Sequence, residues 1–150
     1  SDKTSTIKCV PITSSLKKVG LKRKFQVQCA YPLYSVGCGV NQESFKVTST
    51  VASVSGVNVT SGIFATKEDG WFIGGEFVCN NVRRLIVDHT GSTIKLSAVI
   101  IGLSASDSFT AYAGCDHSLE TCRDKFSNKL NYGGQPYIPT KNPFSGDAIV

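Results

Sequence analysis

The chain has 150 residues, of which 41% are hydrophobic and 18% are charged. This is enough apolar material for one domain with a core, and too little charge for a disordered tail. The longest apolar run, residues 98–103, is far shorter than the roughly 20 residues that a membrane helix needs. Sixteen Lys and Arg against eleven Asp and Glu leave a net charge of +5, which favours an anionic partner only weakly.

Residues 1–43 form a leader that holds a basic stretch and the first pair of cysteines. Five of the eight residues from Lys17 to Lys24 are basic, namely Lys17, Lys18, Lys22, Arg23 and Lys24. The plain interpretation is a solvated surface stretch, and the sharper one is a patch that faces nucleic acid or the acidic surface of a partner. Aromatic residues do not alternate with these basic ones, so stacking on bases is not indicated.

Residues 44–113 have the pattern of a compact β domain. Residues 44–54 alternate and are rich in β-branched side chains, and residues 82–100 are typical of two strands around a turn at residues 88–92. Gly74 and Gly75 interrupt an aromatic stretch and indicate a bulge or a bend. Several short strands at this spacing predict a mainly β fold, a small barrel or sandwich.

Residues 114–150 predict a short helix followed by an irregular C-terminal tail. Residues 116–126 carry the helix pattern, with Asp116 or Ser118 as the N-cap. Seven helical residues advance about 10 Å, which exceeds the roughly 7 Å between bridged Cα atoms. A disulfide between Cys115 and Cys122 is therefore not expected. The residues that follow are rich in Gly, Pro and Asn, as in a segment without regular structure.

The six cysteines are the unusual feature of the composition. Four of them form two pairs, Cys29 with Cys38 and Cys115 with Cys122, which suggests two loops that converge on a shared zinc ion or iron–sulfur cluster. Zinc sites favour two to four residues between paired cysteines, whereas these pairs bracket eight and six residues, so the spacing favours the cluster. Zinc, disulfides and free thiols stay open as alternatives. The two remaining cysteines lie among apolar residues and are expected to be buried thiols: Cys9 and Cys79.

The signs of an enzyme are few. His89 falls in the predicted hairpin turn, where exposure to solvent is expected. His117 follows Cys115 and Asp116, but a nucleophilic cysteine usually takes its base from a residue close in space rather than in sequence. The chain has no P-loop, GxSxG or HExxH motif. We expect a protein that is not an enzyme; the alternative is a cysteine-dependent enzyme that uses Cys115 or Cys122 with His117.

Two segments resemble a known family. CVPITSSLKKVGLKRKFQVQC, followed by YPLYSVGCGVNQESF, is similar to the opening of the C-terminal domain of phage tail-tip (baseplate hub) proteins. AGCDHSLETCRDKFSNKLNYGGQPYIPTKNPF is similar to the closing segment of that domain, with the pattern CR.KF.N..N.GG.P.IP around the second cysteine pair. The family includes the lambda-type tail-tip protein L and the hub protein of gene transfer agents. The resemblance covers nearly the whole chain, and the β domain is its least distinctive part.

The resemblance implies a cofactor, a location and partners. The cofactor would be an iron–sulfur cluster, [4Fe–4S], with zinc as the alternative, and its ligands would be Cys29, Cys38, Cys115 and Cys122. The protein would be a virion structural component at the tail tip, within a symmetric assembly. Its partners would be the distal tail ring and the central hub or fibre, with contact to DNA in the tail channel or to the host envelope.

The resemblance also implies a mechanical role. By tying together two segments that flank the β domain, the cluster would act as a clamp for tail assembly, host attachment or DNA delivery. Proteins of this family usually carry a further N-terminal portion, so we expect a fragment or a subunit without that domain. The first residues lack the apolar stretch of a secretory signal, and assembly in the reducing host cytoplasm would keep thiolates available for a metal. A zinc-stabilised binding module and a disulfide-bonded domain are the rival hypotheses.

Overall fold

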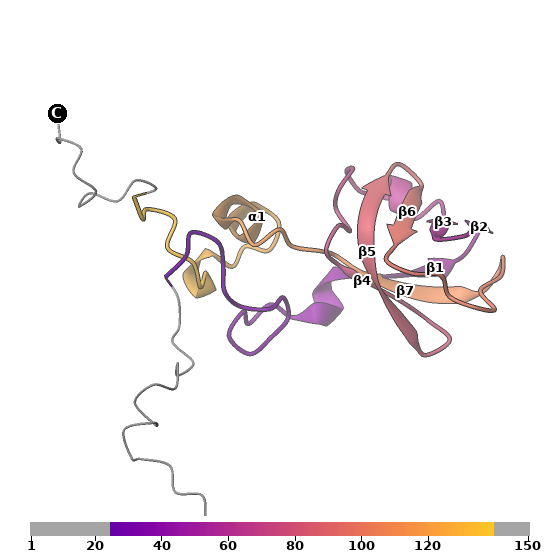
Figure 1. Cartoon of the computed structure of the whole chain (residues 1–150), viewed down its shortest axis with the longest axis horizontal. Coiled ribbons are helices and arrows are strands. Elements are labelled where there is room, and N and C mark those ends of the chain that lie inside the picture. Colours follow the sequence, from indigo (N-terminus) through magenta and orange to yellow (C-terminus); the bar gives the residue numbers. More distant parts are fainter. Residues whose placement is uncertain (1–24, 140–150) are drawn as a thin grey trace, which may run out of the picture.

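The structure is a computed structural model, and it describes residues 25–139. Cys9 and the basic residues Lys17, Lys18, Lys22, Arg23 and Lys24 lie outside the described residues, so their predicted roles stay predictions. Figure 1 shows a β domain and, beside it, a smaller region built from the segments that precede and follow it. We call this smaller part, residues 25–41 and 114–139, the cysteine region. Within residues 25–139, no helix is long and apolar enough to span a bilayer.

Seven short strands build the β domain: β1 (Lys46–Thr50), β2 (Ser53–Ser55), β3 (Asn58–Thr60), β4 (Glu76–Cys79), β5 (Val82–Thr90), β6 (Thr93–Leu96) and β7 (Ser108–Tyr112). They form one sheet in the order β1-β7-β4-β5-β6-β3-β2, and all neighbouring strands are antiparallel. The sheet curls into a small barrel-like shape (Figure 1). Short 3-10 turns η2 (Gln42–Phe45) and η3 (Phe64–Thr66) precede β1 and follow β3.

The helix α1 (Leu119–Asp124) and the 3-10 turn η4 (Lys129–Asn131) follow the sheet in the cysteine region. The predicted fold class is thereby confirmed, because a mainly β unit lies between two cysteine-bearing segments, with one short helix and an irregular tail. The chain enters and leaves the β domain at one place, since β1 pairs with β7 and the Ala113 N–H donates to the Phe45 carbonyl at 3.1 Å.

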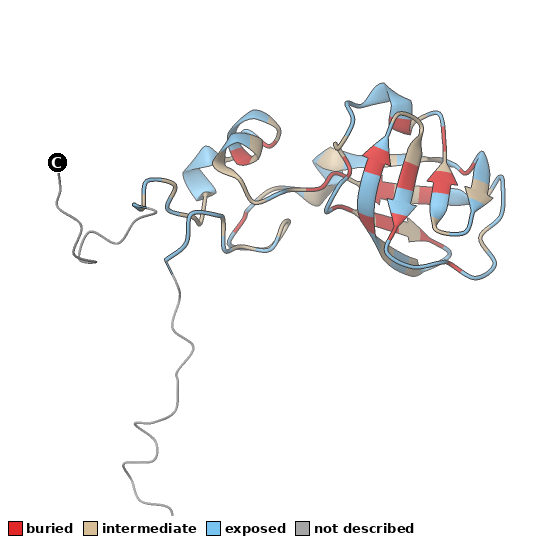
Figure 2. Ribbon diagram, turned by 45° about the horizontal axis from the view of Figure 1, so that its top comes forward, coloured by how far each residue is buried: buried red, intermediate tan, exposed pale blue. Residues whose placement is uncertain are grey.

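Aromatic side chains fill the core of the β domain. Phe109 stacks on Phe64 and on Phe77, with ring centroids 5.2 and 4.9 Å apart, and Phe72 meets Phe64 edge-on at 5.3 Å. Such pairs add about 0.5–1.5 kcal/mol each to the burial of their apolar surface. Cys79 belongs to this core and is 2% exposed, which confirms it as a buried thiol. Figure 2 shows that buried residues gather on the strands.

The expected exposure of His89 is wrong. The strand β5 continues to Thr90, so the turn before β6 is only Gly91 and Ser92, and His89 is 2% exposed. The pairing of β5 with β6 shifts register between Ile86 and Asp88. Such a bulge moves the following side chains to the other face of the strand. It turns His89 into the core, where its ring lies 5.0 Å from that of Phe72.

The Gly74–Gly75 break marks a close crossing of two backbones. A Cβ on Gly75 would lie 2.1 Å from the Tyr112 carbonyl oxygen, and a Cβ on Gly114 would lie 1.8 Å from the Ile73 carbonyl oxygen. No side chain fits at either position, because real Cβ contacts are essentially never this short. The two glycines therefore let the end of β7 pass tightly against the chain before β4, directly upstream of Cys115.

Candidate metal centre

The two cysteine-bearing segments lie side by side, although the whole β domain separates them in sequence (Figure 1). The Cys29 N–H donates to the His117 carbonyl at 2.9 Å. The Tyr132 hydroxyl donates to the Val27 carbonyl at 2.7 Å and to the His117 carbonyl at 3.2 Å. The first two bonds cross between the segments, the third lies within the second segment, and all three have main-chain carbonyls as acceptors. The main chain therefore brings the first cysteine pair to the second.

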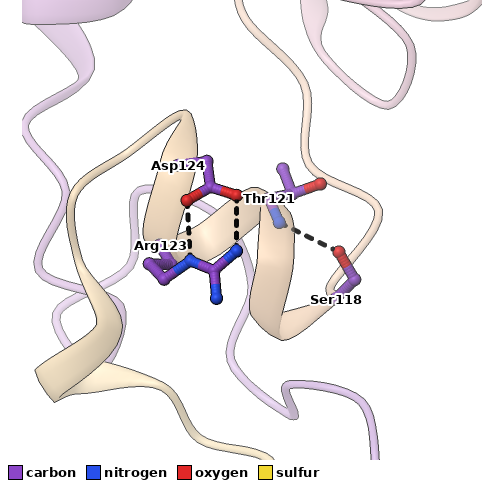
Figure 3. Close-up of polar contacts among 4 residues, drawn as sticks. All are labelled: Ser118, Thr121, Arg123 and Asp124. Atoms are coloured by element: carbon purple, nitrogen blue, oxygen red, sulfur yellow. Dashed lines mark hydrogen bonds and ion pairs between the residues drawn. The ribbon is translucent and has the colours of Figure 1, made fainter.

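The helix α1 begins at a side-chain cap. The Ser118 hydroxyl oxygen accepts a hydrogen bond from the Thr121 N–H at 3.1 Å, which makes Ser118 the N-cap (Figure 3). In the last turn of the helix Arg123 forms an ion pair with Asp124, with Nε and Oδ1 2.7 Å apart. Both partners are more than half exposed, so this pair stabilises the helix little. The cap fixes where the helix begins and hence where Cys122 lies.

Cys115 lies outside this helix, so the expectation that seven helical residues separate it from Cys122 is wrong. Asp116 Oδ1 accepts hydrogen bonds from the Ser118 N–H at 3.0 Å and the Ser118 hydroxyl at 2.8 Å. His117 has a φ of 63°, in the left-handed region. This local turn competes with helical hydrogen bonding and stops the helix from extending back to Cys115.

The four predicted ligands share the cysteine region, and no disulfide joins any of the five cysteines that the structure describes. Cys38 and Cys122 are 8% and 7% exposed, while Cys29 and Cys115 are half-buried. One buried and one half-buried thiol thus come from each segment. This distribution gives each pair one member shielded from solvent.

N–H groups point at three of the four sulfurs. Cys29 Sγ accepts from the Gly133 N–H at 3.3 Å, and Cys115 Sγ accepts from the His117 N–H at 3.3 Å. The side-chain amide nitrogen of Asn128 lies 3.9 Å from Cys38 Sγ. Hydrogen bonds donated to sulfur favour the thiolate, which is the form that binds metals.

Burial and neighbouring thiols raise the pKa of Cys115 and Cys122. Burial raises the pKa of the Cys122 thiol, and Cys115, Cys29 and Cys38 raise it further. Burial likewise raises the pKa of Cys115, partly offset by the hydrogen bond from the His117 N–H, with smaller contributions from Cys38 and Cys29. Four thiolates gathered in this region would repel each other, and a bound metal cation offsets that repulsion.

The donor set fits two metal groups. Four thiolates are the ligands of structural zinc ions and of iron–sulfur clusters alike. Among the described residues, no three or more His, Cys, Asp or Glu side chains are grouped closely enough to hold one metal ion. The assignment of Cys29, Cys38, Cys115 and Cys122 as ligands stays a prediction.

Two glycines of the cysteine region pack against the ring of Tyr31. A Cβ on Gly37 would lie 2.7 Å from the ring of Tyr31, and a Cβ on Gly133 would lie 2.5 Å from the same ring. Gly37 precedes Cys38, and the Gly133 N–H is the donor to Cys29. Gly37 and Gly133 therefore pack the two segments together against Tyr31, a role that their spacing in sequence does not indicate.

Lys125 was not singled out by the sequence, yet it joins the cysteine region to the β domain. Its Nζ donates hydrogen bonds to the Trp71 carbonyl and, at 2.7 Å, to the Gly114 carbonyl. The same ammonium lies 4.5 Å from the centre of the Trp71 ring. Burial lowers the pKa of Lys125 to about 8. Lysines are mostly exposed, so the sequence offers no pattern that would have revealed this contact.

A cleft of about 700 Å³ separates the two regions beside Cys115. Trp71 and Ile73 contribute apolar surface to its wall, and Lys125 lies among its lining residues. Its remaining charged lining residues are acidic: Glu68, Asp69, Asp116, Glu120 and Asp124. The half-buried Cys115 thus borders a space that opens to solvent.

Two comparisons with known proteins found similarity to phage-related proteins. Residues 70–142 match a family described as "Phage conserved hypothetical protein BR0599", a span that includes β4 to β7 and the second cysteine pair. The fold is similar to that of a chain in a solved structure described as "Virion of native gene transfer agent (GTA) particle". The TM-score is 0.67 at 24% sequence identity, over 91% of this chain and 53% of that chain. The present chain thus spans about half the length of its structural match.

No curated protein matched the chain in the sequence search. The two matches agree with the phage and gene transfer agent resemblance in its broad form. Neither description specifies a tail-tip position or a metal.

Proposed function

We propose that the protein is a structural component of a phage-type virion, located at the tail tip, in which four cysteines bind an iron–sulfur cluster, [4Fe–4S]. The observation that carries the proposal is the meeting of two cysteine pairs, 77 positions apart, in one hydrogen-bonded region. The similarity to a phage family and the fold shared with a gene transfer agent virion chain support the virion setting.

The cysteine region works as a clamp in this proposal. The bonds from Cys29 to His117 and from Tyr132 to both segments hold the chain in place. The N–H groups of Gly133 and His117 stabilise negative charge on two of the sulfurs. A bound cluster supplies metal–thiolate bonds that cross-link the two segments. The clamp would thereby give the β domain a fixed orientation on its neighbours.

The protein would act by binding rather than by catalysis. Its partners would be the distal tail ring and the central hub or fibre, around a channel that DNA passes. The burial that raises the pKa of Cys115 and Cys122 is the opposite of what a nucleophilic cysteine needs. This argues against a nucleophilic role for these two thiols.

Metal analysis of anaerobically purified protein tests the cofactor. We expect iron and acid-labile sulfide in a brown protein, and loss of both in Cys38→Ala. Cys79→Ala is the matched control, because Cys79 is also buried but lies in the core of the β domain. A colourless protein that contains stoichiometric zinc would contradict the iron–sulfur cluster and favour the zinc-stabilised binding module. Absence of any metal would overturn the proposal.

The position in the particle is tested separately. An antibody against the β domain should label particles at the tail tip when they are viewed by electron microscopy. Labelling of the capsid, or of free protein only, would contradict the proposed location without affecting the metal assignment.

A further inference from the structure

One asparagine contacts both cysteine pairs. Asn128 follows α1, and its side-chain Nδ2 donates to the Cys38 carbonyl at 2.6 Å, across 90 positions of sequence. Its main chain binds the other pair, because the Asn128 N–H donates to the Cys122 carbonyl at 2.9 Å and the Cys122 thiol donates to the Asn128 carbonyl at 3.4 Å. The two most buried of the four thiols therefore meet through one residue.

The Asn128 amide is itself fixed in orientation. Asn131 Nδ2 donates to Asn128 Oδ1 at 2.8 Å, so the oxygen of the amide is occupied and its NH2 group faces Cys38. The same NH2 group lies 3.9 Å from Cys38 Sγ. Both residues are asparagines of the CR.KF.N..N pattern. An amide suits this place because it accepts on one side and donates on the other, which a carboxylate does not do.

We propose that Asn128 is a positioning residue of the four-cysteine centre. Its side chain holds Cys38 beside Cys122 and keeps both thiols shielded from solvent before any metal binds. An aspartate at this position would place a carboxylate oxygen against the Cys38 carbonyl and add negative charge beside the sulfurs. The role toward a bound metal rests on the proposed function, whereas the contact between the segments does not.

Thiol alkylation of the metal-free protein tests the contact. Residue-by-residue mass spectrometry after iodoacetamide treatment gives each alkylation rate, which is divided by the thiolate fraction from its pH dependence because the added carboxylate disfavours nearby thiolates. The corrected rates of Cys38 and Cys122 should be at least about fivefold higher in Asn128→Asp, the ratio that corresponds to one lost hydrogen bond of ordinary strength. Asn58→Asp is the matched control, since it makes the same charge change at an exposed position of β3 and should leave these rates unchanged. Unchanged rates in Asn128→Asp would overturn the proposal.

The core thiol Cys79 serves as the internal check that the β domain is folded. If Cys79 also becomes reactive in Asn128→Asp, the β domain of that variant has been perturbed. The test is then made with the uncharged variant Asn128→Ser, whose side chain is too short to reach the Cys38 carbonyl. Faster alkylation confined to Cys38 and Cys122 in that variant supports the proposal, and wild-type rates refute it.

A second measurement uses protein reconstituted with iron and sulfide. We expect a lower midpoint potential in Asn128→Asp, because the added negative charge and the lost N–H donor disfavour the reduced state. Asn58→Asp should match the wild type. A wild-type protein that binds no metal would refute the proposed function, and the alkylation rates would still decide the role of Asn128.

Discussion

At the scale of the residue, Lys125 shows how much one long side chain contributes to the join between the two regions. Lys125→Met keeps most of the aliphatic stem and its packing on Trp71, but it leaves the Trp71 and Gly114 carbonyls without this donor. We expect the free energy of unfolding to fall by about 1–3 kcal/mol, the cost of an unpaired buried acceptor at the Gly114 carbonyl, since the Trp71 carbonyl still accepts from the Gly114 N–H. Urea denaturation followed by tryptophan fluorescence measures this change.

Lys67→Met is the control for that measurement. Lys67 also lies over the Trp71 ring, at 5.1 Å, but it is exposed. Its replacement should change stability by less than about 0.5 kcal/mol, as is usual at the surface. Equal effects of the two substitutions would show that the carbonyl contacts of Lys125 stabilise nothing.

His89 is a polar residue in an aromatic core. Within the described part of the chain, neither of its ring nitrogens has a hydrogen-bond partner. His89→Leu removes these buried polar atoms at similar volume, so we expect the free energy of unfolding to stay constant or rise by about 1 kcal/mol. Thermal unfolding measures the change. A loss of more than about 1 kcal/mol would mean that the imidazole contributes an interaction that leucine cannot replace.

At the scale of the element, the crossing at Gly75 has no room for a side chain. Gly75→Ala must push apart the chain before β4 and the end of β7, because its Cβ would lie 2.1 Å from the Tyr112 carbonyl oxygen. We expect a loss of about 3 kcal/mol or more in the free energy of unfolding. Gly62→Ala is the matched control, since no atom lies within 4 Å of its Cβ. Similar melting temperatures for the two variants would contradict the close crossing.

Local sequence patterns predicted the elements whose determinants are local. Alternation and β-branching indicated the β strands, and Ser118 was one of the two N-caps considered for the helix. The position of His89 could not be predicted, because the bulge in β5 arises from its pairing with β6. The exclusion of Cys115 from the helix depends on a side-chain turn at Asp116 that competes with helical bonding.

The convergence of the two cysteine pairs was expected only from their pairing in sequence and from the resemblance. Which groups hold the segments together could not be inferred, because those contacts join residues that lie far apart in sequence. Asn128 reaches Cys38 across 90 positions, and Lys125 reaches Trp71 across 54. Contacts of this range leave no periodic pattern in the chain.

At the scale of the whole molecule, the two regions should respond differently to loss of the proposed metal. The β domain has its own aromatic core, whereas the cysteine region has few buried residues (Figure 2). After removal of the metal by a chelator, amide hydrogen exchange should accelerate at Cys29 and Gly133, while the amides of β4 and β5 keep their protection. Uniform acceleration along the chain would instead mean that the β domain depends on the metal to stay folded.

The way the chain enters and leaves the β domain determines which region bears a pulling force first. The Gln135 N–H donates to the Gln26 carbonyl at 2.8 Å, and the β1–β7 pair closes the β domain further along, so tension between residues 25 and 139 acts first on the cysteine region. The β domain comes under load only after the cysteine region has opened. In an optical trap, the first extension step should therefore come from the cysteine region and should need a higher force when metal is bound. In the proposed virion role, the cysteine region would therefore extend under load while the surface of the β domain stays intact.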